Sequence, residues 1–216
     1  MLPRTRVGQK LRFFHKQPQR AFTSRAHVTE PEYYEGPLDG TAPEHRCYIL
    51  LHAKDRPPKF PKAIHTQVSR ELLARGARLG GISVNFAWME HFANDLVASG
   101  KQSATVYSHL GGRLDIPHVS LNNIDEVERQ IFQHIGGPLT EQTSENVDIY
   151  VCTHEARDCR CGERGQQVYD AFIRAVQLER RKNFSGFSDN IRIGAVGHVG
   201  GHKYAANVLI YPYGEW

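Results

Sequence analysis

Histidines and cysteines in the C-terminal third of the chain combine residue types and spacings that suit metal binding. His198 and His202 stand four positions apart around Val-Gly-Gly, and Cys152, Cys159 and Cys161 fall within ten residues. Thiolates and neutral imidazoles are ligands for zinc and for iron. Cysteines clustered in this way indicate a metal site or redox chemistry rather than the disulfide framework of a small secreted domain.

Elements predicted around these residues would position them. VDIYVCTH (147–154) has the apolar, β-branched character of a strand, and Cys152 lies near its end. The polar stretch EARDCRCGERG, which contains Cys161, is predicted to be a loop. After this loop we predict a helix (166–181), a strand (191–197), a turn with both histidines, and a last strand (207–212).

This order predicts that the candidate ligands converge. Loops at the ends of neighbouring strands carry the functional groups of many α/β proteins. We therefore expect two thiols and two imidazoles to lie close together at one edge of the sheet. They are the side chains of Cys152, Cys161, His198 and His202. The paired glycines between the histidines allow positive φ angles, which let the turn place both rings on one side.

The ligand set alone leaves the metal open. A zinc finger uses closely spaced cysteines and a short reach to its histidines. Here nine positions separate Cys152 from Cys161, and a predicted helix and strand precede His198. A structural zinc site is still compatible with two cysteines and two histidines. The same set matches a [2Fe–2S] cluster in which histidines replace two cysteines, as in Rieske centres.

The C-terminal motifs resemble the sucrase/ferredoxin-like family. The resemblance rests on the C-x8-C of Cys152 and Cys161, on the H-x3-H of His198 and His202, and on the following strand with Tyr-Pro-x-Gly-x-Trp. It is dense over residues 147–216. It implies a thioredoxin-like ferredoxin domain and a [2Fe–2S] cluster bound by these four residues. It also implies a role in mitochondrial electron transfer or thiol redox balance, with an unidentified protein as redox partner.

Two features depart from the family pattern. Members of the family normally continue beyond the tryptophan that is Trp216 here, so the C-terminal domain is expected to be truncated or minimal. Cys159 forms Cys-Arg-Cys with Cys161, and it is a candidate redox thiol or alternative ligand. A thiol at this position would suit disulfide exchange.

The N-terminal segment, residues 1–29, has the composition of a mitochondrial transit peptide. It contains seven Lys and Arg residues, no Asp or Glu, and no long apolar stretch of the secretory kind. The net charge of +4 comes from this segment, because the rest of the chain has 20 basic and 23 acidic residues. We expect a mitochondrial location, in the matrix or the intermembrane space; a disordered basic arm is the alternative. The remainder shows no basic excess for nucleic-acid binding and no apolar run of transmembrane length.

The chain beyond this segment is predicted to be α/β, with two domains. Residues 30–46 are rich in Pro, Gly and acidic residues and indicate a linker. A small α/β domain is expected over 47–137, and the polar stretch PLTEQTSEN before residue 147 marks the boundary with the C-terminal domain. The strands predicted in the first domain are 47–53, 81–87 and 103–110, and the helices are 63–78 and 122–137. No internal repeat stands out.

Other polar residues have less specific interpretations. Cys47 begins an apolar strand and is expected to be a packed core thiol. His154 either donates a hydrogen bond to a ligand of the metal centre or is a solvated loop residue. The stretch HLGGRLDIPH, with His109, Asp115 and His118, is expected to be a solvated loop.

Three functional classes are compatible with these features. The first is a [2Fe–2S] redox protein, the second a thiol–disulfide oxidoreductase that uses Cys159 and Cys161, and the third a zinc-stabilised interaction module without redox activity. The sequence shows no P-loop, no dinucleotide fingerprint and no carboxylate pair placed for glycoside hydrolysis.

Overall fold

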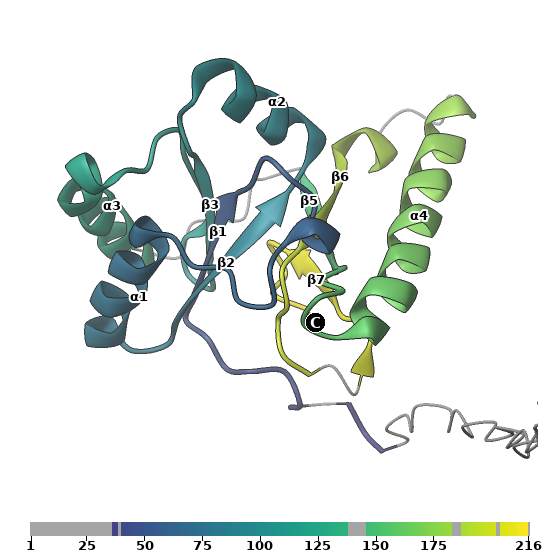
Figure 1. Cartoon of the computed structure of the whole chain (residues 1–216), viewed down its shortest axis with the longest axis horizontal. Helices are drawn as coiled ribbons and strands as arrows, with labels where there is room; N and C mark the ends of the chain where they lie inside the picture. Colours follow the sequence, from purple (N-terminus) through teal and green to yellow (C-terminus); the bar gives the residue numbers. More distant parts are fainter. Residues whose placement is uncertain (1–35, 39, 138–145, 183–186, 202–203, 216) are drawn as a thin grey trace, which may run out of the picture. The chain divides into compact units, whose positions relative to one another are not determined.

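Apolar, β-branched runs form one mixed sheet in the computed structural model, which describes residues 36–38, 40–137, 146–182, 187–201 and 204–215 (Figure 1). In sheet order the strands run β4-β3-β1-β2-β6-β5-β7. Their bounds are β1 (Cys47–His52), β2 (Ile82–Trp88), β3 (Ala104–Ser108), β4 (Gly112–Ile116), β5 (Val147–Cys152), β6 (Ile191–Val196) and β7 (Val208–Tyr211). With the helices below, this arrangement confirms the predicted α/β class.

Four α-helices are present among the described residues. They are α1 (Gln67–Leu79), α2 (Glu90–Ser99), α3 (Ile124–Gly136) and α4 (Cys159–Arg181). Short 3-10 helices are η1 (Pro57–Lys59), η2 (Leu121–Asn123) and η3 (Phe187–Asn190). None of the helices in the described part of the chain combines the length and the apolar character of a membrane span.

Most predicted elements of the first half are confirmed, but α2 and β4 were missed. The stretch HLGGRLDIPH is not a solvated loop throughout, because it forms the turn of a β3–β4 hairpin and β4 itself. His109 and His118 are exposed, as expected for loop residues, whereas Asp115 lies within the strand and bonds Arg113. Short strands joined by a tight glycine turn give a weaker periodic signal than a long apolar run.

The two regions predicted as separate domains, 47–137 and 147–216, contribute strands to the same sheet. They join where β2 pairs antiparallel with β6, through Ala87↔Val196 and Trp88↔Ala195. All described residues belong to one compact unit that begins at residue 33. The predicted boundary itself falls mostly outside the described residues.

The two halves share a strand connectivity that the sequence does not reveal. In the first half, α1 connects the parallel strands β1 and β2, and β3 pairs antiparallel with β1. In the second half, α4 connects the parallel strands β5 and β6, and β7 pairs antiparallel with β5. Because β2 and β6 are antiparallel, the carboxyl ends of β1 and β5 point to opposite ends of the sheet.

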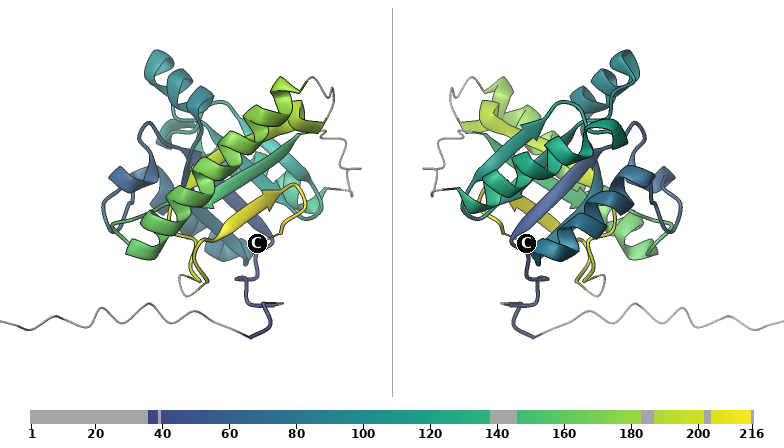
Figure 2. Two further views of the ribbon diagram at one scale, coloured as in Figure 1. Left: turned by 90° about the vertical axis from the view of Figure 1, so that its right-hand side faces the viewer. Right: turned by 90° about the vertical axis from the view of Figure 1, so that its left-hand side faces the viewer.

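The sheet curls so that one of its faces closes on itself. Tyr107 of β3 stacks on Tyr211 of β7 with ring centroids 4.0 Å apart, although four strands lie between β3 and β7 in the sheet. This inner core also contains Tyr150, Cys152 and Leu209. On the outer face, α1 and α3 pack against the first half and α4 against the second, as the two views of Figure 2 show.

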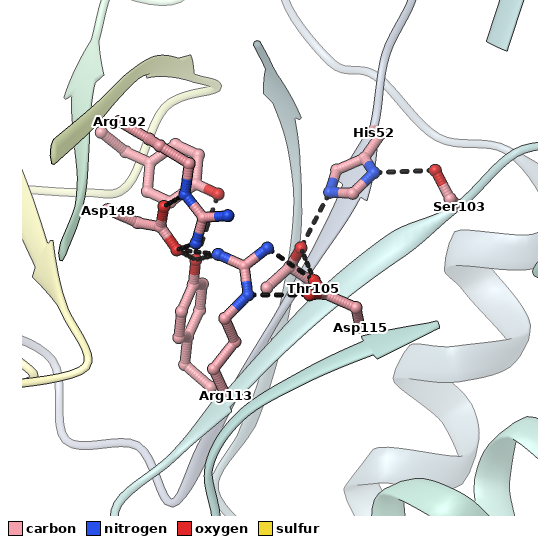
Figure 3. Close-up of polar contacts among 9 residues, drawn as sticks. His52, Ser103, Thr105, Arg113, Asp115, Asp148 and Arg192 are labelled. Atoms are coloured by element: carbon pink, nitrogen blue, oxygen red, sulfur yellow. Dashed lines mark hydrogen bonds and ion pairs between the residues drawn. The ribbon is translucent and has the colours of Figure 1, made fainter. Parts of the chain in front are cut away.

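A polar network lies on the inner face, at the end of the sheet where β5 begins (Figure 3). Asp148 is 1% exposed and bonds Arg192 at 2.6 and 2.9 Å. It also accepts hydrogen bonds from Arg113 and from the Tyr107 hydroxyl. Arg113 comes from the first half and Asp148 from the second, so the network ties the halves together.

Candidate functional site

Three of the four predicted ligands meet at one end of the sheet. The ligand atoms of Cys152, Cys161 and His198 all lie within 4.8 Å of one another. Cys161 Sγ is 3.8 Å from His198 Nδ1. The fourth predicted ligand, His202, lies outside the described residues.

Strand register explains why the three residues converge. β5 and β6 are parallel, and Cys152 is paired with Val196. The ends of the two strands therefore lie side by side, and His198 follows β6 after one glycine. Asn207 bonds the carbonyl oxygens of Gly200 and Gly201 at 2.9 and 3.2 Å, which shapes the next part of the turn. Both glycines have positive φ angles, 89° and 54°, as the sequence predicts.

The segment predicted as a cysteine loop is helical from Cys159 onward. The loop prediction for EARDCRCGERG is wrong in its second half, because α4 begins at Cys159 rather than near residue 166. Asp158 caps the helix by accepting a hydrogen bond from the Arg160 N–H at 3.0 Å. Cys161 therefore lies in the first turn of a helix, where it faces Cys152. Gly162 and Gly165, within the first seven residues of α4, lower its helix propensity, which is why the sequence pattern does not reveal the start of the helix.

Gly165 explains how α4 comes close enough to β5. A Cβ atom added at Gly165 would overlap the carbonyl oxygen of Cys152. A Cβ at Gly162 would come within 2.5 Å of the Glu155 side chain. The helix can therefore approach the end of β5 only where it has no side chain, and this approach brings Cys161 to Cys152.

Gly165→Ala is expected to destabilise the protein by about 1–3 kcal/mol, since the new methyl group forces backbone apart in a packed region. Gly136→Ala is the matched control, because Gly136 ends α3 and a Cβ there would meet nothing within 4 Å. Urea unfolding of both variants measures the difference. Equal midpoints for the two variants would contradict a tight contact between α4 and β5.

Burial and mutual hydrogen bonding set the charge of the two thiols. Both are fully buried. The pKa of Cys152 is lowered to about 5, mainly because the Cys161 thiol donates a hydrogen bond to it, with a further contribution from His198. The pKa of Cys161 is raised, because its proton is shared with Cys152 and because the thiol is buried. The lowered pKa of Cys152 favours its thiolate, the form that binds metals.

His154 is buried and holds the turn that carries His198. Its Nδ1 accepts the backbone N–H of His198 at 3.2 Å, and its Nε2 donates to the carbonyl oxygen of Pro61 at 3.0 Å. Burial lowers the pKa of His154, so the ring is neutral and serves as both donor and acceptor. The solvated-loop interpretation of His154 is wrong. Its partner is the backbone beside the candidate ligand.

Asn85 has a similar role that sequence reasoning missed. Its amide nitrogen donates to the carbonyl oxygens of Gly197 and His198, both at 3.2 Å, and its Oδ1 accepts the Phe86 N–H at 2.8 Å. A signal was present, because an asparagine interrupts the otherwise apolar run of GISVNFA. A polar amide inside a strand has to find partners when it is buried.

The other two cysteines differ sharply from the ligand pair. Cys47 is buried in the core between the sheet and α1 and α3, as predicted, and burial raises the pKa of its thiol to about 12. Cys159 is exposed, although it is only two residues from Cys161. All four cysteines are free thiols.

Comparison with known proteins gives partial matches to fungal proteins. Actin patches distal protein 1 of Saccharomyces cerevisiae is 39% identical over 70 residues, 31% of this chain and 22% of that protein. Altered inheritance of mitochondria protein 32 of Meyerozyma guilliermondii is 33% identical over 88 residues, 40% of this chain and 29% of that protein. The protein of the same name from Saccharomyces kudriavzevii is 41% identical over 61 residues, 28% of this chain and 16% of that protein. The matched segments thus span less than a third of these relatives, and no solved structure matches the chain.

A family model extends the likeness across almost all of the described chain. The sucrase/ferredoxin-like model matches residues 38–216, which include both halves of the sheet and the candidate metal site. The match also includes the first half, where the sequence motifs are vague. The chain therefore belongs to the sucrase/ferredoxin-like family.

Proposed function

We propose that this protein binds a [2Fe–2S] cluster through Cys152, Cys161, His198 and His202 and exchanges single electrons with a partner protein. The observation that carries the proposal is the convergence of two thiols and one imidazole within 4.8 Å. Membership of the sucrase/ferredoxin-like family supports it. His202 completes the set by its spacing from His198 in the sequence.

The donor set fits such a group chemically. Thiolate and imidazole donors select zinc and iron–sulfur centres over calcium or magnesium. Both thiols are buried within an apolar and aromatic core that includes Leu50, Met89 and Val196. A cluster in this site would supply one-electron chemistry, at a higher potential than an all-thiolate site because neutral imidazoles replace anionic thiolates.

The chain's own residues would prepare and protect the site. The hydrogen bond from Cys161 lowers the pKa of Cys152, which favours the deprotonated form that a metal requires. His154 and Asn85 fix the backbone on either side of His198 and limit the orientations of its ring. Of the three converging residues, His198 alone is partly exposed, so it connects the buried thiols with the surface.

We also propose the thioredoxin-like arrangement for the C-terminal half. Support comes from the β5–α4–β6 unit of parallel strands with β7 antiparallel beside β5. A mitochondrial location is part of the proposal. It is supported by the basic, acid-free segment 1–29 and by the names of several relatives.

Thiol exchange between Cys159 and Cys161 fits the geometry less well. Positions two apart on a helix point to nearly opposite sides. Cys159 accordingly faces solvent while Cys161 faces the core. A disulfide between them would require the first turn of α4 to unwind.

Anaerobic purification of the full chain, followed by metal and sulfide analysis, tests the proposed function. We expect iron and acid-labile sulfide in equal amounts, a visible absorption band, and an EPR signal after reduction. His202→Cys is expected to shift that signal, while His118→Cys, at an exposed histidine of the first half, leaves it unchanged. Stoichiometric zinc without sulfide or colour would instead support a zinc-stabilised module.

A further inference from the structure

One strand inside the sheet has an open edge beside the candidate metal site. β2 pairs with β1 along its length, from Ile82 to Ala87. Its pairing with β6 on the other side is confined, among the described residues, to Ala87 and Trp88. The N-terminal part of β2 therefore has a neighbouring strand on one side only. β6 ends at Val196, and past the hydrogen bond from Gly197 to Phe86 no strand among the described residues continues the pairing along β2.

Hydrogen bonds at the two ends of β2 show to which side each of its backbone groups points. The carbonyl oxygens of Gly81 and Ala87 accept hydrogen bonds from the β1 side, at 2.7 Å from the Arg46 N–H and 2.8 Å from the Ala53 N–H. The carbonyl oxygen of Phe86 instead accepts the Gly197 N–H at 2.8 Å, on the opposite side.

Alternation along the strand then fixes the direction of the remaining groups. Successive residues of a strand direct their N–H and C=O groups to alternate sides. Ile82 and Val84 therefore direct theirs away from β1. No hydrogen bond joins these four groups to the part of the chain that the structure describes.

Asn85 closes the gap at its inner end. Its side chain bonds the Phe86 N–H and the Gly197 carbonyl oxygen, the groups that a paired strand would otherwise satisfy. The Asn85 amide thus takes the place of a paired strand at Phe86 and Gly197. The open edge consists of the unpaired groups before it, at Ile82 and Val84. Unpaired strand edges are sites where an extended segment of another chain can add.

A cationic cavity of about 380 Å³ adjoins the open edge. Residues 82–86 of β2 line this cavity, and so do His198 and Val199. Lys62, His65 and Arg157 line it as well, all three are exposed, and no carboxylate does so among the described residues. Lys62 and Arg157 form no ion pair with any described residue.

We propose that an acidic, extended segment of a partner protein docks here by adding as a strand to the open edge of β2. Charge complementarity selects this occupant, since the cavity presents cations and lacks carboxylates. The chain's own segment 1–29 has the wrong charge, because it is basic and acid-free, and the described part of the acidic stretch 30–46 contributes only Pro43 to the cavity lining. A second copy of the chain, paired through the same edge, would bring Lys62 and Arg157 toward their own counterparts.

The docked segment would lie beside His198, the partly exposed member of the candidate metal site. The inference thus rests on the proposed function. The partner would be a one-electron carrier, which gains the electron that the reduced centre loses, or the reverse. Docking supplies proximity and orientation for that exchange.

Fluorescence anisotropy with labelled, capped hexapeptides tests the docking on the full chain. The probe is Glu-Val-Glu-Thr-Glu-Val, which alternates carboxylates with β-branched residues. One control carries N-methyl groups on alternate peptide nitrogens, which removes strand hydrogen bonds and keeps the charge. The other replaces each Glu by Lys. We expect binding of the first peptide alone, weakening as salt is raised.

Protein variants locate the binding site. Arg157→Glu is expected to weaken binding about tenfold. The matched Arg181→Glu at the far end of α4, about 33 Å along the helix, should change it less than twofold. Val84→Pro removes one N–H group on the open side of β2. A strand tolerates proline at a position whose N–H has no partner strand. We expect Val84→Pro to weaken peptide binding relative to Val84→Thr.

The outcomes separate the docking from the cluster. Equal binding of the N-methylated peptide, or equal loss in Arg157→Glu and Arg181→Glu, would overturn the docking whether or not iron is present. A concentration-dependent dimer that Val84→Pro dissociates would assign the edge to a second copy and overturn it too. Peptide binding that persists in Cys152→Ala, after the metal is lost, would support the docking site independently of the proposed function.

Discussion

Cys161→Ala is expected to abolish metal binding, whereas Cys159→Ala leaves it intact. The two cysteines are two residues apart in the first turn of α4, yet Cys161 is buried against Cys152 and His198, and Cys159 is exposed. Removing a ligand from a small centre should weaken metal affinity by more than the roughly tenfold to hundredfold loss that follows when a residue hydrogen-bonded to a ligand is replaced. Cys159 contributes no atom to the group, so its loss costs at most local surface packing.

The measurement is iron and sulfide per chain after anaerobic purification of both variants beside the wild type. Circular dichroism and urea unfolding of the same preparations show whether the variants keep their fold. Iron retained in Cys161→Ala and lost in Cys159→Ala would exchange the two assignments. It would also require a different start for α4, since helical geometry turns Cys159 away from Cys152.

The sequence predicts the convergence of the site because its main determinants are local. VDIYVC and IRIGAV are apolar, β-branched runs, and α4 lies between them, so a parallel pair with adjacent carboxyl ends follows from general rules. Cys152 and His198 occupy those ends. The paired glycines after His198 predict the positive φ angles that the structure shows.

The positions of Cys159 and Cys161 were harder to predict, because tertiary contact overrides local propensity. Two glycines within the first seven residues of α4 weaken the helical signal. The close approach of α4 to the backbone at the end of β5 requires glycine at Gly165. No sequence pattern reveals this contact. The low helix propensity of the glycines favours a loop, whereas packing against β5 favours a helix. The loop prediction was incorrect because it took account of the propensity alone.

Long-range features could not be predicted from periodicity. The β2–β6 pairing involves two residue pairs, and the curl of the sheet brings Tyr107 to Tyr211 across four strands. Asp148 did give a signal, since a carboxylate interrupts the apolar run of β5. A buried carboxylate requires partners, but their identity, Arg113 from β4 and Arg192 from β6, depends on how the halves meet.

Asp148→Ala is expected to destabilise the protein by about 3–5 kcal/mol, the cost of breaking a buried ion pair by removing one partner. Arg113 and Arg192, whose side chains are 9% and 27% exposed, would lose the carboxylate that both of them bond (Figure 3). The Tyr107 hydroxyl would lose its acceptor as well. Arg113 and Tyr107 are nearly inaccessible to water, so water cannot replace the lost carboxylate there as it can at a surface charge.

The hydrogen-bond network around Asp148 extends into the first half through a second carboxylate, that of Asp115. Arg113 also bonds both oxygens of Asp115, which accepts the Thr105 hydroxyl at 2.8 Å. Thr105 in turn accepts from His52 Nε2 at 3.0 Å, and burial lowers the pKa of His52 to about 3, so this ring is neutral. Moving Arg113 would therefore disturb β1, β3 and β4 together, and the loss should be felt in the first half although Asp148 belongs to the second.

Urea unfolding compares Asp148→Ala with Asp55→Ala, which removes a carboxylate from an exposed ion pair with Lys59. Surface pairs of this kind contribute about 0–1 kcal/mol, so the control should unfold near the wild-type midpoint. Tryptophan fluorescence and far-UV circular dichroism should lose their signals together in Asp148→Ala, because the network joins both halves of one sheet. Separate transitions in the wild type, or equal midpoints for the two variants, would mean that the halves fold independently and that Asp148 does not couple them.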